Sequence, residues 1–265
     1  MPLTTGAILL FLWGLLSATC ASAAGGTIWT TPHESYSSSV GVLGCKVDTN
    51  RIAYWPQSID CSNICVSVSY DGRQLYLLRI DQSGGAYDMS YDAWNYLYTG
   101  YSATSKPTAG GAIAMEYTDV DASKCAGLIQ TKDKKLALSA SNSMNFIASC
   151  LEQQDSWVAK NYVLYNIQDP LCSYGYDERC ALDFPAQNQA KCPNPLGSPV
   201  ALTTAPVYNI RYPTGEKVLA SNGGQQGAGS TSVAAGLHVG TSVMSLWASL
   251  LMPLTCWQML RLDFS

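Results

Sequence analysis

The middle of the chain alternates short apolar runs with turn signals, as expected for β-structure. Arg51–Trp55 ends at Pro56, and Cys65–Tyr70 alternates apolar and polar residues with a period of two. Asp71-Gly72 follows, a dipeptide typical of two-residue hairpin turns. Gln74–Ile80 is therefore expected to be the partner strand of a β-hairpin.

One helix is expected to interrupt these strands. Ser90–Leu97 places Ala93, Trp94 and Leu97 on one helical face, with Ser90 as the N-cap residue. Gly111–Thr118 then returns to a strand pattern. The pattern predicts a small β-barrel or sandwich with an inserted helix.

Residues 126–192 have a different pattern. Ser143–Gln154 is expected to form a helix and Asn161–Ile167 a strand, followed by a loop-rich segment held by cysteines. The segment is predicted to be an α/β appendage, and it either folds alone or wraps the barrel. Five of the twelve prolines fall within residues 193–213, so 193–222 is predicted to be an extended stalk.

The N-terminus carries an apolar run of ten residues, Ala7–Leu16, followed by the small-x-small sequence Ala21-Ser22-Ala23. A run of this length is too short to span a bilayer, and the following pattern suits signal peptidase. We predict that residues 1–23 are a secretion signal, with a buried N-terminal helix as the alternative.

The C-terminus resembles a signal for a glycosylphosphatidylinositol (GPI) anchor. Small residues around Asn222 precede a polar spacer, Gln225–Ser232, and an uncharged apolar tail, Val233–Leu260. Asn222 is the expected lipid attachment residue, with Ser221 the next choice, so residues 223–265 would be a propeptide. The alternative is a single membrane-spanning helix.

The charge balance argues against nucleic acid as a partner. The 265 residues include 15 Lys and Arg against 19 Asp and Glu, a formal net charge of −4. Nucleic-acid binding requires a concentrated positive surface, and no Lys/Arg block occurs.

Eight cysteines remain when one in the predicted signal and one in the tail are set aside. An even number in a secreted chain predicts four disulfides. Zinc is disfavoured, because there is no Cys-x-x-Cys pair and His33 is the only histidine outside the tail. We expect no metal and no cofactor, and we interpret the surroundings of His33 as a polar loop. The eight residues are Cys45, Cys61, Cys65, Cys125, Cys150, Cys172, Cys180 and Cys192.

All sixteen tyrosines lie between Tyr36 and Tyr212. A tyrosine ring offers an apolar face with a hydroxyl at its rim, which suits stacking on sugars. Aromatic residues also fill sheet cores, and the two interpretations are left open. The densest cluster is Tyr87, Tyr91, Trp94, Tyr96, Tyr98 and Tyr101.

An ordered set of markers resembles the six-stranded double-psi β-barrel of barwin, RlpA-like proteins, expansin N-terminal domains, fungal loosenins and family-45 endoglucanases. The resemblance covers residues 44–125 and implies a mainly β barrel domain over 24–125. Its markers are Gly44-Cys45, Arg51-Ile52-Ala53, Cys61 and Cys65, the strands Cys65–Tyr70 and Leu75–Asp81, Tyr87-Asp88-Met89-Ser90, and Gly111–Cys125.

The resemblance implies that Asp88 occupies the position of the general acid in the related hydrolases. Inverting hydrolysis also needs a basic carboxylate about 6.5–9.5 Å away, but Glu34 is the only acidic residue in the stretch 24–47. Expansins and loosenins likewise keep the acid position without the base, although Ala86 stands where expansins carry histidine. The implied role is disruption of polysaccharide contacts without net hydrolysis. A turn or helix-capping role is the alternative for Asp88.

The resemblance also implies a disulfide pattern. Cys45 would pair with Cys61, and Cys65 with Cys125, inside the barrel. The last four cysteines would then pair among themselves, in an arrangement that the sequence leaves open.

We therefore expect a secreted monomer, tethered to the membrane by a lipid, that binds cell-wall polysaccharide in a groove containing Asp88 and Asp81. One alternative is a hydrolase or lytic transglycosylase using Asp88 with Asp81 or Glu34. Another is a protein-binding effector or inhibitor module. The expected stacking platforms are Tyr36, Tyr54, Trp55, Tyr87 and Trp94.

Overall fold

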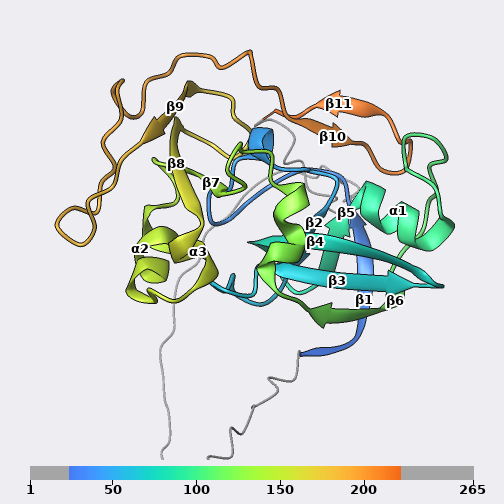
Figure 1. The fold of residues 1–265 in the computed structure, drawn as a ribbon. Coiled ribbons are helices and arrows are strands. Elements are labelled where there is room, and N and C mark those ends of the chain that lie inside the picture. The colour runs from blue at the N-terminus through green and yellow to red at the C-terminus, as the bar shows by residue number, and fades with distance from the viewer. Residues whose placement is uncertain (1–23, 222–265) are drawn as a thin grey trace, which may run out of the picture. The chain divides into compact units, whose positions relative to one another are not determined.

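The computed structural model describes residues 24–221, which contain a closed six-stranded barrel followed by an α/β appendage (Figure 1). The barrel strands are hydrogen-bonded in the order β1-β5-β2-β4-β3-β6, and β6 pairs with β1 to close the ring. Two pairings are parallel, β1 with β5 and β2 with β4. The chain is mainly β, as predicted. The barrel strands are β1 (Gly25–His33), β2 (Ile52–Trp55), β3 (Cys65–Tyr70), β4 (Arg73–Gln82), β5 (Tyr87–Ser90) and β6 (Ile113–Asp119).

All six strands contribute to one apolar core, which therefore fills the barrel. Helix α1 (Tyr91–Thr99) adds Trp94 and Leu97 to this core, and the Trp94 indole donates a hydrogen bond to the Thr30 carbonyl at 3.2 Å. The helix ends at Gly100, whose φ of 82° suits glycine. One core residue from each strand is Ile28, Ala53, Val66, Leu77, Met89 and Met115.

The opposite face of β2 and β4 is covered by the appendage. Ile52 and Ile80 share a second core with Leu138 and Ile147 of the appendage. Side chains alternate between the two faces of a strand, so β2 and β4 are apolar on both sides. The appendage comprises β7 (Leu136–Ser139), α2 (Met144–Glu152), α3 (Trp157–Lys160), β8 (Tyr162–Ile167) and β9 (Gly175–Cys180). Two short 3-10 helices precede it in the chain: η1 (Gly44–Lys46), between β1 and β2, and η2 (Ala122–Leu128), after β6.

Most elements predicted from the sequence are present. The hairpin turns at Asp71 and Gly72, which both have positive φ, 48° and 74°, as a type I′ turn requires. The predicted helices correspond to α1 and α2. The interpretation of the His33 region as a loop is wrong, because β1 ends at His33 and pairs with both β5 and β6.

The disulfides correct the expected pairing of Cys45 with Cys61 and the expectation that the last four cysteines pair among themselves. Cys65–Cys125 and Cys180–Cys192 are bonded. Cys45 is bonded to Cys172 rather than to Cys61, and Cys61 is bonded to Cys150 on α2. Both bonds join the barrel to the appendage, which packs on β2 and β4, so the described residues form one compact unit.

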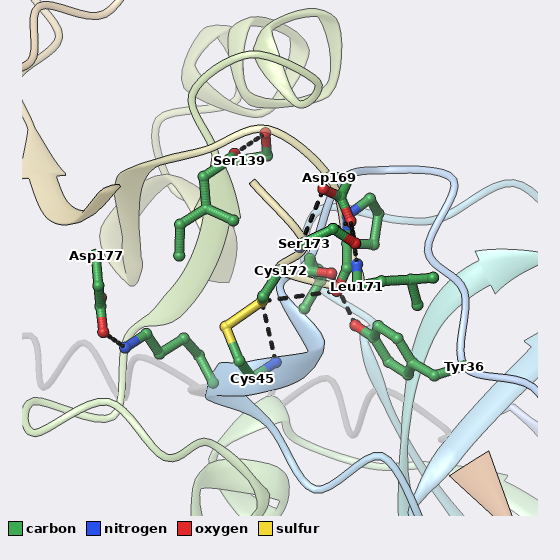
Figure 2. The surroundings of a disulfide bond; sticks show 12 residues. Tyr36, Cys45, Ser139, Asp169, Leu171, Cys172, Ser173 and Asp177 are labelled. Atoms are coloured by element: carbon green, nitrogen blue, oxygen red, sulfur yellow. Dashed lines mark hydrogen bonds and ion pairs between the residues drawn. A yellow bond between two sulfur atoms is a disulfide. The ribbon is translucent and has the colours of Figure 1, made fainter. Parts of the chain in front are cut away.

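Polar contacts surround the Cys45–Cys172 bond (Figure 2). Lys46 forms an ion pair with Asp177 at 2.6 Å, and Asp169 accepts a hydrogen bond from the Leu171 amide at 2.9 Å. The ion pair joins η1 to β9, and the Asp169 contact shapes the loop that carries Cys172, which the Gly44 amide holds through a hydrogen bond to the Pro170 carbonyl at 2.8 Å.

The segment predicted to be a stalk packs against the barrel instead. Strands β10 (Tyr208–Ile210) and β11 (Lys217–Leu219) form a hairpin, and Val207 and Ile210 are buried. The Tyr36 amide donates to Asn209 Oδ1 at 2.9 Å, and the Tyr212 ring packs edge-on against Tyr91 of α1. Prolines extend this segment, but buried apolar residues fix it to the fold.

The predicted secretion signal, residues 1–23, and the predicted anchor region, with Asn222 and residues 223–265, lie outside the described residues. Within residues 24–221, no helix is long and apolar enough to cross a membrane.

Candidate functional site

Asp81 and Asp88 lie on either side of Tyr54 on the barrel wall. Tyr54 of β2 is in register with Asp81 of β4 and with Asp88 of β5. Neighbouring strands are about 4.8 Å apart, so the two aspartates are separated by two strand spacings, roughly 10 Å. The sheet thus brings together the two carboxylates expected from the sequence.

Asp88 is the more available of the two. It is half-buried, and its carboxylate accepts one side-chain hydrogen bond, from the hydroxyl of Thr31. Thr31 lies opposite Asp88 in the parallel β1–β5 pairing. An aspartate carboxylate can accept about four hydrogen bonds, so Asp88 retains acceptor capacity for a ligand.

Asp81 is only 8% exposed, and its acceptor capacity is used inside the fold. One carboxylate oxygen accepts from the hydroxyl of Ser37, and the other accepts from the amides of Ser39 at 2.7 Å and Gln82 at 2.9 Å. Asp81 therefore holds the segment after β1 against β4. A carboxylate so occupied is poorly placed to activate water beside Asp88.

Tyr54 and Tyr36 are buried in the same region. The Tyr36 hydroxyl donates to the Val42 carbonyl at 2.7 Å, and the Tyr54 ring packs at 4.5 Å from the imidazole of His33. Burial raises the pKa of both phenols well above the usual range, and the nearby charge of Asp81 adds to this effect. Both tyrosines belong to the core and are neutral at physiological pH.

Among the other proposed stacking platforms, only Tyr87 is partly exposed. Trp94 is 0% exposed and Trp55 is 1% exposed, so neither indole offers a face to a ligand in this conformation. The Tyr87 hydroxyl accepts a hydrogen bond from Gln57 at 2.7 Å, and its ring packs edge-on against Trp55.

Glu34, the other carboxylate considered as a partner of Asp88, contacts the segment that follows β10. Its carboxylate accepts a hydrogen bond from the Tyr212 amide at 2.8 Å. With His33 it lines a small cavity between the barrel and β10, together with Tyr36, Tyr54, Asp92 and Tyr208. Among residues 24–221, no three His, Cys, Asp or Glu side chains are arranged to hold a metal ion.

Sequence reasoning missed Trp29 on β1, whose side chain is 66% exposed. Trp29 and Thr31 are two residues apart and therefore lie on the same face of the strand. The available sequence signal was the run of β-branched and aromatic residues Thr27, Ile28, Trp29 and Thr30, which favours a strand.

The barrel also matches a known family. The family model of Cerato-platanin matches residues 15–128, less than half of the chain, and this range includes β1 to β6. Proteins of that family have an expansin-like fold, are secreted and wall-associated, and bind carbohydrate. No curated protein and no solved structure matches the chain. The match thus agrees with the resemblance in the barrel and says nothing about the appendage.

Proposed function

We propose that this protein binds a polysaccharide of the cell wall through the barrel face around Asp88, without net hydrolysis. The observation that carries the proposal is the contrast between the two aspartates. Asp88 is half-buried with a single side-chain partner, whereas Asp81 is buried and occupied. Of these two aspartates only Asp88 is therefore available, whereas an inverting hydrolase needs a closely spaced pair of carboxylates.

The match to the Cerato-platanin family supports a carbohydrate ligand and a location outside the cell. The carboxylate of Asp88 can accept hydrogen bonds from sugar hydroxyls. Loosening of the wall would follow if binding competes with contacts between polysaccharide chains.

The test pairs retention on insoluble wall polysaccharide with release of soluble reducing ends, using the purified mature protein. We expect retention without steady release of sugar. Asp88→Asn should weaken retention roughly twofold to tenfold, the equivalent of about one net hydrogen bond. Asp183→Asn, which changes an exposed aspartate of the appendage, is the matched control.

Two results would contradict the proposal. Steady turnover that Asp88→Asn abolishes would assign a hydrolase or lytic transglycosylase. A complete lack of retention on wall material would leave a protein-binding role as the better interpretation.

We also propose that the mature protein is held at the cell surface by a lipid on Asn222. The support is the sequence pattern of a small-residue site, a polar spacer and an uncharged tail. A phosphatidylinositol-specific phospholipase should release the protein from intact cells. Peptides from residues 233–260 in the mature protein would instead identify the tail as a membrane helix.

A further inference from the structure

Trp29 lies between two matching pairs of side chains on the outer face of the barrel. Two residues before it, the Thr27 hydroxyl donates to Glu116 of β6 at 2.6 Å. Two residues after it, the Thr31 hydroxyl donates to Asp88 of β5. Residues 27, 29 and 31 share one face of β1 and span about 13 Å at 3.3 Å per residue.

The Trp29 indole is exposed to solvent because its cross-strand neighbour on β6 is small. Trp29 is in register with Ala114 of β6, and 66% of its surface is exposed. A tryptophan on a sheet usually packs against a large cross-strand partner. This one is instead flanked by an alanine methyl group and, along β1, by two threonine–carboxylate pairs.

We propose that Trp29 is the stacking platform of an extended glycan-binding strip formed by Thr27, Trp29, Thr31, Asp88 and Glu116. The inference rests on the polysaccharide binding proposed above and lengthens its site along β1. The ring of Trp29 packs on the apolar face of one sugar. The carboxylates on either side accept hydrogen bonds from the hydroxyls of the neighbouring sugars.

The composition of the strip favours a glycan over a protein partner. A protein-docking site is expected to present a contiguous apolar patch with a hydrophobic centre. Here a single exposed ring is surrounded by hydroxyl and carboxylate groups. A sugar chain has the complementary pattern, with apolar ring faces and hydroxyls at the rim.

The charge of the strip also restricts the glycan. Strands β1, β5 and β6 contain no lysine or arginine, but they carry Asp88, Glu116 and Asp119. A carboxylate on the ligand would be repelled by the two carboxylates that flank Trp29. We therefore infer that the strip binds glycans without negative charge and rejects uronic-acid polymers.

The first test measures the affinity of the purified mature protein for an uncharged β-glucan. Trp29→Ala should weaken binding roughly threefold to tenfold, and Trp29→Phe should restore most of it. Tyr174→Ala removes another exposed aromatic residue, on the appendage, and should change nothing. Because Trp29 is exposed, the thermal midpoint should stay constant in all three variants.

The second test compares polygalacturonate with its fully methyl-esterified form, which has the same backbone without the charge. The protein should bind the methyl ester more strongly than the charged polymer. Glu116→Gln should reduce this difference in binding, and the glutamine still accepts the hydrogen bond from Thr27. Equal or stronger binding of the charged polymer would contradict the inference that the strip rejects negatively charged glycans.

The outcomes separate this inference from the function on which it rests. If the unmodified protein binds glucan and the Trp29→Ala variant binds equally well, the proposed binding strip is contradicted, while the proposed function stands. If the unmodified protein binds no polysaccharide, the proposed function itself fails, and the strip fails with it.

Discussion

Asp81 and Asp88 are in register with the same residue of β2, yet their side chains are held in opposite ways. Asp81 is buried beneath the segment that follows β1 and accepts from two backbone amides and a serine hydroxyl. Asp88 accepts from one threonine hydroxyl and remains half-buried. One aspartate therefore serves the fold, and the other is available to a ligand.

This difference predicts opposite effects of two similar substitutions. Asp81→Ala should lower the free energy of unfolding by about 2–4 kcal/mol, because the Ser37 hydroxyl and the Ser39 amide lose the charged acceptor that the buried Asp81 provides. Asp88→Ala should lower it by about 1 kcal/mol or less and act mainly on glycan retention. Urea unfolding of both variants measures the contrast. Equal losses of stability would contradict the division of roles.

Alkaline pH should unfold the protein through its buried tyrosines. The folded state raises the pKa of Tyr36 and Tyr54 above the unfolded value of about 10, so it holds both protons more tightly than the unfolded chain. Their contribution to stability is complete below pH 10 and is lost as the pH rises further, by about 1.4 kcal/mol per pH unit for each tyrosine.

Tyrosinate absorbance and urea unfolding between pH 9 and about 12 test this slope. Tyr54→Phe should reduce it, while Tyr174→Phe on the exposed surface should leave it unchanged. A free energy of unfolding that stays constant across this pH range would show that folding does not raise the pKa of the two phenols.

The two classes of disulfide should differ in their effect on stability. Cys61–Cys150 closes a separation of 89 residues and ties α2 to the barrel, whereas Cys180–Cys192 closes only 12. Replacing the first pair by alanines should cost roughly 3–5 kcal/mol, and replacing the second about 2–3 kcal/mol. Burial of Cys61 and Cys150 adds a cavity term to the first value.

Urea unfolding of the two double variants measures this difference, and mapping of disulfide-linked peptides should recover Cys61 with Cys150. A peptide joining Cys45 to Cys61 would restore the pairing expected from the family resemblance.

Trp94→Ala should act on folding rather than on ligand binding. The indole is fully buried in the barrel core and donates to the Thr30 carbonyl. Its loss leaves a cavity and an unpaired carbonyl and should cost about 3–5 kcal/mol. Normal stability combined with lost glycan retention would place Trp94 in the binding site after all.

The sequence was sufficient for elements whose signals are local. The Asp71-Gly72 turn, the helix beginning after Ser90 and the alternation in Cys65–Tyr70 all depend on neighbouring residues, and all are present in the fold. The pairing of Cys65 with Cys125 was implied by the family resemblance, which also implied the incorrect pairing of Cys45 with Cys61. Asp88 was likewise found by its place in a short motif.

The sequence did not determine what depends on contacts between distant segments. Trp29 and Trp94 are both aromatic residues in plausible strands or helices, but only packing decides that one is 66% exposed and the other fully buried. Cys61 pairs with Cys150 because α2 belongs to the apolar core that the appendage shares with β2 and β4. Spacing along the chain carries no information about that docking.

The tertiary structure also decided between Asp81 and Asp88. Both residues lie in or beside segments that the sequence predicts as strands or motifs of the barrel, and both were candidate site residues on sequence alone. The distinction arises because the segment with Ser37 and Ser39 folds back over β4 and takes up the carboxylate of Asp81. A residue's own sequence context gives its chemical group, but the groups that bury or occupy it come from elsewhere in the chain.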